Sequence, residues 1–247
     1  DGLIYLHRAA NGTWSHELLH RATLYKSSSA IAVDQSGEVV ILMPERRAPF
    51  RILMFSKKAG SASWKHQTFA SSDSPAFVAL ATSATRDTVY ASYRKLDSAA
   101  KTQSVHFAIR DTTGAFRHET VYQQHTLSAT SLYDAPLAVD KRGGVHMAIG
   151  HWSFEGLPTS QPDIWDTRYR GGLRYAYRAP SGGWLTSDVE PMAQATKKGV
   201  PGPWRSEPED WTGAVYFMSP SITVDPGLRP HISYTGVGTT EPVSYTH

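Results

Sequence analysis

The chain has 247 residues, an apolar fraction of 40% and no cysteine, so neither a disulfide framework nor a thiolate metal site can form. No apolar run approaches the ~18 residues of a membrane-spanning helix, and we expect no membrane insertion. The net charge is only +3 and the basic residues are scattered. A nucleic-acid binder would show a denser basic stripe, so we expect no nucleic-acid partner.

Short alternating runs joined by turns recur along the chain. Within residues 131–184, a run ends at Asp140, a glycine-containing turn follows, and a second run starts at Val145. The same order of run, aspartate, turn and run occurs around Asp34 and Asp225. Period-2 runs bounded by such turns predict antiparallel strands, and no segment has the periodicity of a long helix. The sequence therefore predicts an all-β fold.

The spacing of the repeats predicts a β-propeller. A late aromatic residue follows a turn near the end of each unit, at Trp64, Phe116 and Trp184. The C-terminal unit lacks this aromatic, whereas Trp14 lacks the start of a unit, so the two termini together make one complete repeat. We predict a single domain over residues 1–247 with four recognisable blades, in a ring of four or five, closed by pairing of the terminal strands. The predicted blade units are 28–70, 74–124, 129–190, and 214–247 completed by 1–22.

Two recurring residue types have structural interpretations. Asp34, Asp140 and Asp225 each end a strand just before a turn, where a carboxylate can accept backbone N–H bonds and hold the turn. We expect the late aromatics to pack between adjacent blades.

Two segments interrupt the repeat, and we expect both to be loops on one face of the propeller. They are residues 150–170 and 191–213, and they hold four of the seven tryptophans together with several arginines. Aromatic rings stack on the apolar face of a sugar, and arginine recognises carboxylates, so the segments predict a carbohydrate site. The alternative is a small satellite core that holds the loops down. The candidate ligand-binding residues are Trp152, Phe154, Trp165, Arg168, Arg170, Trp204, Arg205 and Trp211.

Two histidines are candidates for acid–base chemistry. His146 lies within an alternating run and His151 lies just after it, with Tyr169 in the same interruption as a partner. The alternative for each is a structural histidine, and His231 repeats the position of His146 in a plainer unit. The eleven histidines show no metal-ligand spacing, so we predict neither a metal nor another cofactor.

The segments Tyr133–Asp140, Gly144–His151 and Leu173–Tyr175 resemble the BNR-like propeller repeats of secreted bacterial proteins. These include lectin-like modules and propeller-fold lyases that act on uronate polymers such as ulvan. In the lyases, a histidine just after the second strand of a blade serves in β-elimination with a tyrosine, and His151 matches that position. The chain departs from the pattern where Tyr133 or Asp134 replaces the usual histidine ahead of the proline.

Our leading functional hypothesis is a carbohydrate-binding propeller, secreted or periplasmic, whose partner is a neutral or acidic polysaccharide or oligosaccharide. The first alternative is a uronate-polysaccharide lyase acting through His151 and a tyrosine. The second alternative is a scaffold that binds another protein. The sequence does not indicate an oligomeric state.

Overall fold

The computed structural model contains strands and turns in all the segments that it describes. These are residues 2–21, 29–45, 50–73, 77–83, 85, 87–111, 114–125, 131–132, 134–157, 166–197, 211–212, 218–235 and 244–246. Only the backbone is described for residues 125, 131, 152–157, 166–171, 190–197, 211–212, 218–219, 235 and 244–246. No helix that could cross a membrane occurs in these segments. The predicted all-β class is confirmed.

Antiparallel strands form five sheets in chain order, which we call the first to the fifth sheet. The first sheet pairs β1 (Gly2–Arg8) with β2 (Trp14–Arg21). The second has the order β3 (Ala30–Val33), β4 (Val39–Pro44), β5 (Arg51–Lys57), β6 (Lys65–Ser71). The third has the order β7 (Val78–Thr82), β8 (Val89–Asp97), β9 (Thr102–Arg110), β10 (Phe116–His125).

The fourth sheet has six strands and the fifth has three. In the fourth, both β11 (Ser131–Leu132) and β12 (Leu137–Val139) pair with β13 (Val145–Leu157), and β14 (Asp166–Arg178), β15 (Trp184–Lys197) and β16 (Trp211–Thr212) follow. The fifth sheet comprises β17 (Met218–Val224), β18 (Pro230–Thr235) and β19 (Ser244–Thr246).

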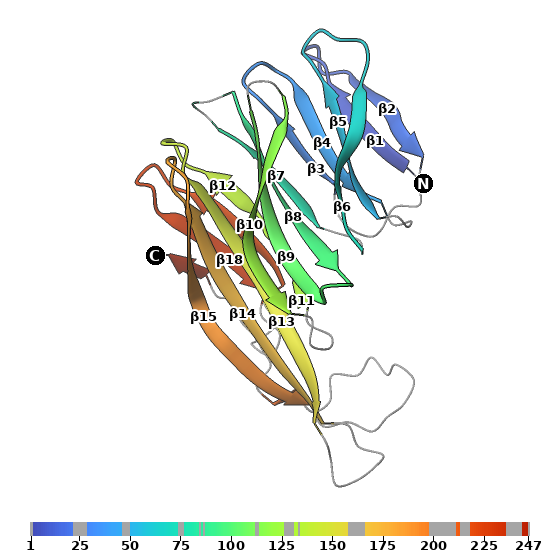
Figure 1. Cartoon of the computed structure of the whole chain (residues 1–247). Coiled ribbons are helices and arrows are strands. Elements are labelled where there is room, and N and C mark those ends of the chain that lie inside the picture. The colour runs from blue at the N-terminus through green and yellow to red at the C-terminus, as the bar shows by residue number, and fades with distance from the viewer. Residues whose placement is uncertain are drawn as a thin grey trace.

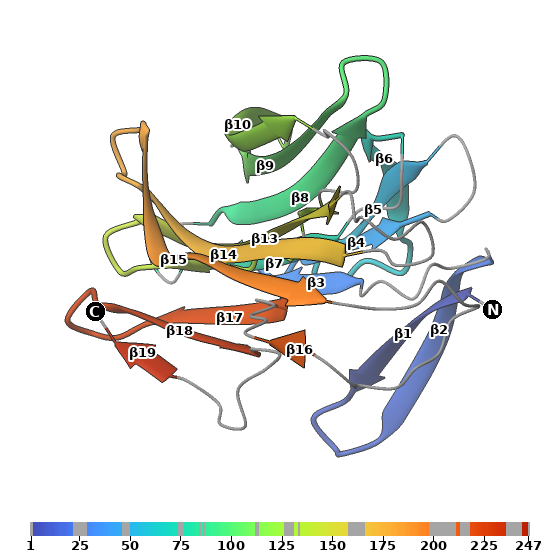
Figure 2. The same cartoon turned by 90° about the horizontal axis from the view of Figure 1, so that it is seen from below.

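Successive sheets stack face to face, as blades of a propeller do. A separate apolar cluster fills each of the four interfaces, for example Leu3 against Met43 and Phe55 between the first and second sheets. One strand from each later sheet contacts the next in turn: β3 contacts β7, β7 contacts β12, and β12 contacts β17. Figure 1 labels the strands, and Figure 2 shows the sheets in an arc with the N-terminal hairpin at one end and β17–β19 at the other.

The aspartates hold their turns as predicted. Oδ1 of Asp140 accepts the N–H groups of Arg142 at 2.7 Å and Gly144 at 2.9 Å. Oδ1 of Asp34 accepts the N–H of Glu38 at 2.8 Å, and Oδ1 of Asp225 accepts that of Arg229 at 2.9 Å. Asp111 makes the same bond to Ala115 at 3.0 Å, in the turn before Phe116, where the repeat pattern did not single out an aspartate.

Three late aromatics pack against the preceding sheet and the fourth does not. Trp64 meets Tyr5 edge-on at 5.0 Å, Phe116 meets Phe69 at 4.9 Å, and Trp184 meets Phe107 at 5.2 Å between ring centroids. Trp14 is 65% exposed. The prediction was wrong for Trp14, because within the described residues no sheet precedes the one that holds it.

The structure does not show the predicted closure of the ring. Among the described strands, β1 pairs only with β2, and the edge of β18 that could receive β1 pairs with β19. Pairing of the terminal strands into one blade therefore stays a prediction.

The segments expected to be loops are partly strands, which corrects the expectation. β13 runs without a break to Leu157 and pairs with β14 from Asp166 onward, so the hairpin extends beyond the blade. β15 continues to Lys197 instead of ending at Glu190. The physical reason is visible in the sequence, since Trp152 and Phe154 alternate with Ser153 and Glu155 in a period-2 pattern.

Candidate functional site

His146 lies at the centre of a buried hydrogen-bonded chain on the fourth sheet. Its Nδ1 is 2.6 Å from the hydroxyl of Tyr175, and its Nε2 is 3.1 Å from Oδ2 of Asp140. The ring is 4.9 Å from that of Tyr177, the residue opposite His146 in the β13–β14 register. His146 and Asp140 are both buried. The structure therefore joins a carboxylate, an imidazole and a phenol in one line.

The surroundings shift the pKa values of Asp140 and Tyr175, the two ends of this row of hydrogen bonds, in opposite directions. Burial alone would raise the pKa of Asp140, but hydrogen bonds from the Gly144 N–H, His146 and the Arg142 N–H outweigh it, and the pKa is lowered. Burial, with Tyr177 and Asp140 nearby, raises the pKa of Tyr175 to about 12. Asp140 is therefore a carboxylate and Tyr175 a neutral phenol at neutral pH.

A pocket of about 360 Å³ opens over the hydrogen-bonded residues Asp140, His146 and Tyr175. Its walls come from three strands of the fourth sheet and from the β17–β18 turn of the fifth. The lining residues are Asp140, Arg142, His146, Tyr175, Tyr177, Leu185, Thr186, Ser187 and Leu228. The pocket thus combines ring faces, aliphatic groups and hydroxyls.

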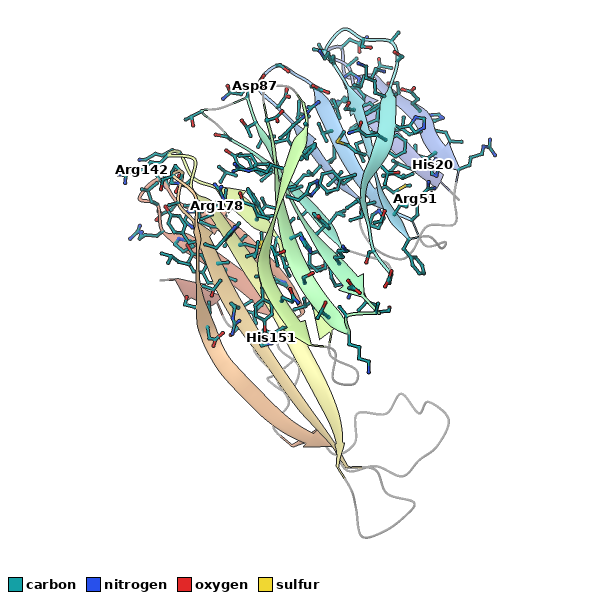
Figure 3. The ribbon with its side chains drawn as sticks, in the orientation of Figure 1. His20, Arg51, Asp87, Arg142, His151 and Arg178 are labelled. Atoms are coloured by element: carbon teal, nitrogen blue, oxygen red, sulfur yellow. The ribbon has the colours of Figure 1, made fainter. Side chains whose placement is uncertain are left out.

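His151 lies elsewhere on β13, in a different environment. It is 6% exposed, and its ring centroid is 6.1 Å from that of Tyr122. Burial and the nearby Arg174 lower its pKa. Arg174 donates a 2.8 Å bond to Asp188 and lies 4.5 Å over the Tyr122 ring. Figure 3 shows Arg142 near the turn end of the sheet and His151 farther along β13, so the two predicted histidines do not share a site.

The predicted ligand-binding residues are only partly covered by the structure. Trp165, Trp204 and Arg205 lie outside the described residues. The backbone is described, and the side chain is not, for Trp152, Phe154, Arg168, Tyr169, Arg170 and Trp211.

The backbone register brings this second group together in one sheet. Trp152 is the Cα partner of Gly171, and Phe154 is the partner of Tyr169. On the other side of β14, Arg168 is the partner of Thr196, and the adjoining Lys197 pairs with Trp211. The extended strands β13 to β16 therefore place the aromatic and arginine positions on neighbouring strands.

Tyr175 and Asp140 are the site residues that sequence reasoning missed. Asp140 was interpreted only as a turn residue, and Tyr175 only as part of an alternating run. The available signal was the hairpin itself, since Tyr177 lies opposite His146 and Tyr175 lies two residues along the same strand. Using that signal requires knowing which residues of β13 and β14 are paired, and this pairing depends on how far the hairpin extends.

A second, larger cleft lies between the second and third sheets, with a volume of about 710 Å³. It is lined mainly by charged and polar groups, including Glu38 and Arg110, which form a 3.1 Å ion pair. Within the described residues, no group of three or more histidines and carboxylates is arranged to hold a metal ion.

No protein-family model and no curated protein matches the sequence. Among solved structures, the chain is similar to an α-L-arabinanase of Penicillium chrysogenum complexed with arabinobiose, with a TM-score of 0.40 and 9% identity over 88% of this chain and 80% of that one. A GH93 α-L-arabinofuranosidase of Fusarium graminearum with arabinobiose has a TM-score of 0.38 and 11% identity, over 88% and 91%. An endo-arabinase of Bacteroides thetaiotaomicron has a TM-score of 0.33 and 12% identity, over 91% and 94%. Similarity of this degree does not identify a substrate for this chain, and it does not test the BNR-like resemblance.

Proposed function

We propose that the chain binds a carbohydrate along the extended part of the fourth sheet, which we call the rim. The observation that supports this function is the backbone register. It places Trp152 and Phe154 on β13, Arg168 to Arg170 on β14 and Trp211 on β16 in one continuous ladder. Successive residues of a strand lie on opposite faces of a sheet, so the positions of Trp152, Phe154, Tyr169 and Trp211 share one face, on strands ~4.8 Å apart, and those of Arg168 and Arg170 share the other. The aromatic face is the proposed platform for the ligand.

The residue types suit a sugar polymer. A pyranose or furanose has an apolar face that stacks on tryptophan or tyrosine. Arg168 and Arg170, on the opposite face, would attract an acidic polymer at longer range. Trp165, Trp204 and Arg205 are further candidates in the same two segments. A secreted or periplasmic location would suit such a ligand and stays a prediction.

The lyase alternative gains no support from the geometry. The Cα partner of Tyr169 is Phe154, whereas that of His151 is Gly172, so the two residues are not paired across the hairpin. His151 instead lies beside Tyr122, with ring centroids 6.1 Å apart. The scaffold alternative stays open and is an outcome of the experiment below.

The test is a glycan array, followed by calorimetric titration of the best ligand with Trp152→Ala and Trp211→Ala. For a stacked, partly exposed ring, each variant should lose about 1–2 kcal/mol of binding, or roughly 5- to 30-fold in affinity, with little change in melting temperature. The matched control is Trp14→Ala, at the far end of the molecule, which should leave glycan binding unchanged.

A tryptophan that is part of a satellite core would behave in the opposite way. Its replacement should cost about 3–5 kcal/mol of folding stability and leave affinity intact at low temperature, and that result would contradict the proposal. Arg168→Ala reports on ligand charge: a loss of affinity that is largest at low salt indicates an acidic polymer. Absence of any glycan binding would favour the scaffold.

A further inference from the structure

The turns that the aspartates hold require a left-handed residue at the third position after the aspartate. Gly37, Gly114 and Gly143 occupy this position after Asp34, Asp111 and Asp140, with φ of 78°, 88° and 85°. In each turn the N–H of that glycine donates a 3.0 Å bond to the carbonyl of the aspartate. Glycine is the expected choice, because it adopts positive φ without a steric cost.

Leu228 is the exception to this pattern. It follows Asp225 by three residues, its φ is 69°, and its N–H donates the same bond to the Asp225 carbonyl at 2.9 Å. A branched side chain in this region is disfavoured, and such outliers gather at functional sites. Leu228 is one of the residues that line the pocket over His146, so the strained position belongs to that pocket.

The pocket floor presents a hydrogen-bond acceptor. Asp140 can only accept, so Nε2 of His146 holds the proton of that bond, and in the neutral ring Nδ1 accepts the hydroxyl proton of Tyr175. The lone pairs of the Tyr175 oxygen are then available to a ligand donor. Thr186 and Ser187 add hydroxyls to the lining, and Tyr177, Leu185 and Leu228 add apolar surface.

We propose that this pocket binds a single sugar ring or a polyol of similar size. Its hydroxyl would donate to Tyr175, and its apolar face would lie against Leu228 and Tyr177. A volume of about 360 Å³ accommodates one such ring with water. The pocket lies at the turn end of β13, away from the rim, so this second site does not depend on carbohydrate binding at the rim.

The experiment titrates the full chain with glucose, galactose, arabinose, rhamnose and glycerol, followed by NMR or calorimetry. One of these should bind with a dissociation constant on the order of 1–10 mM, as for a small ligand with few contacts. Leu228→Gly should weaken that binding at least fivefold while the melting temperature equals or exceeds that of the wild type, since glycine relieves the strain. Lys101→Gly is the matched control, because Lys101 is the other non-glycine residue with positive φ among the described residues, at 51°. It should leave binding unchanged.

Leu185→Ser tests the pocket without altering the backbone. Leu185 is 71% exposed, so its replacement should weaken sugar binding severalfold and leave the fold intact. Leu18→Ser, at a 44% exposed leucine of β2, is its control and should have no effect on binding. The proposal is overturned if none of the five compounds binds, if Leu228→Gly lowers the melting temperature, or if binding survives both pocket variants. Trp152→Ala should not affect these titrations, which separates failure of the pocket from failure of the rim.

Discussion

Tyr93 lies at the centre of a buried group of rings between the second and third sheets. Its hydroxyl is 2.9 Å from Nδ1 of His118, and its ring stacks on that of His106 at 5.1 Å. Burial, with Lys95 and His118 nearby, lowers the pKa of His106 to about 4, and burial also lowers the pKa of His118. Both histidines are therefore held neutral in the folded protein at neutral pH.

This arrangement predicts acid sensitivity. A histidine whose pKa is lower in the folded than in the unfolded chain binds fewer protons when folded, so stability declines as pH falls from about 6.5 through about 4. His106→Gln removes one titrating group while a side chain that can bond to Ser104 remains, and it should make this decline shallower. The measurement is the unfolding free energy by denaturant titration between pH 7 and pH 4.

The exposed histidine His7 provides the control, and His7→Gln should show the pH dependence of the wild type. If His106→Gln leaves the slope unchanged, the ring is not held neutral by burial, and the assignment is wrong.

Between elements, a glutamate on the outer strand of one sheet binds the late tryptophan of the next. Glu119 on β10 accepts bonds from Nε and Nη2 of Arg178 on β14, at 2.9 and 3.0 Å, and from Nε1 of Trp184 at 3.1 Å. Glu17 on β2 likewise accepts Nε1 of Trp64 at 2.9 Å and Nζ of Lys57 at 3.5 Å. Trp64 and Trp184 thus combine apolar packing with a directional bond across their interfaces.

The contacts of Glu119 and Glu17 should differ in the stability that they contribute, because the two sets of side chains differ in solvent exposure. The side chain of Arg178 is 8% exposed and that of Glu119 is 24% exposed, whereas Glu17 is 46% exposed. Glu119→Ala leaves Arg178 buried without its carboxylate and should cost about 2–3 kcal/mol of unfolding free energy, as for hydrogen bonds to charged groups. Glu17→Ala should cost less than ~1 kcal/mol, as for exposed ion pairs. Equal losses in denaturant titrations would contradict this ordering.

At the scale of the whole molecule, the outer face of the first sheet is apolar and uncovered. Ile4, Leu6 and Leu18 are 56%, 62% and 44% exposed, and Trp14 is 65% exposed on the same hairpin. Ile31 and Val33 on β3 are also exposed, since the apolar cluster between the first two sheets involves β4, β5 and Trp64 and does not include β3. Two inner strands beside β1 would cover β3, and β17 and β18 are the strands that the repeat pattern assigns to that place.

Closure would also place Trp14 against the fourth sheet, because β17 and β18 already pack there. Ile222 and Ile232 contact the cluster of Ala148 and Leu173. A blade made of β17, β18, β1 and β2 would continue that packing outward to Ile4, Leu6 and Leu18.

The closure prediction can be tested by distances between spin labels. The sequence contains no cysteine, so only the introduced cysteines would be labelled. Labels at His7→Cys and Ser233→Cys should lie within about 20 Å if β1 joins the fifth sheet, either in place of β19 or beside it, because neighbouring strands are ~4.8 Å apart and the tethers add the rest. Labels at His7 and Ser15, which are Cα partners, calibrate the distance expected for adjacent strands. A distance between His7 and Ser233 much longer than that between His7 and Ser15 would show that the ring stays open.

The residues that determine turns and strands act over a few positions, and these features were predictable from sequence alone. Asp34, Asp140 and Asp225 hold their turns by bonds to N–H groups within four residues, so residue type and spacing suffice. The strands of the second and third sheets follow from period-2 alternation for the same reason. Trp64 and Trp184 were recognised as packing residues, although their glutamate partners were not.

Only the tertiary structure decided which distant groups meet. His146 and Tyr175 are 29 residues apart, and their contact depends on the register of the extended β13–β14 hairpin. Glu119 and Arg178 are 59 residues apart and meet because the third and fourth sheets stack. The strain at Leu228 is not evident from the sequence, since Pro226 and Gly227 already predict a turn before it. Its position becomes informative only when the β17–β18 turn faces the pocket of the preceding sheet, because strain and pocket closure are properties of the packed chain.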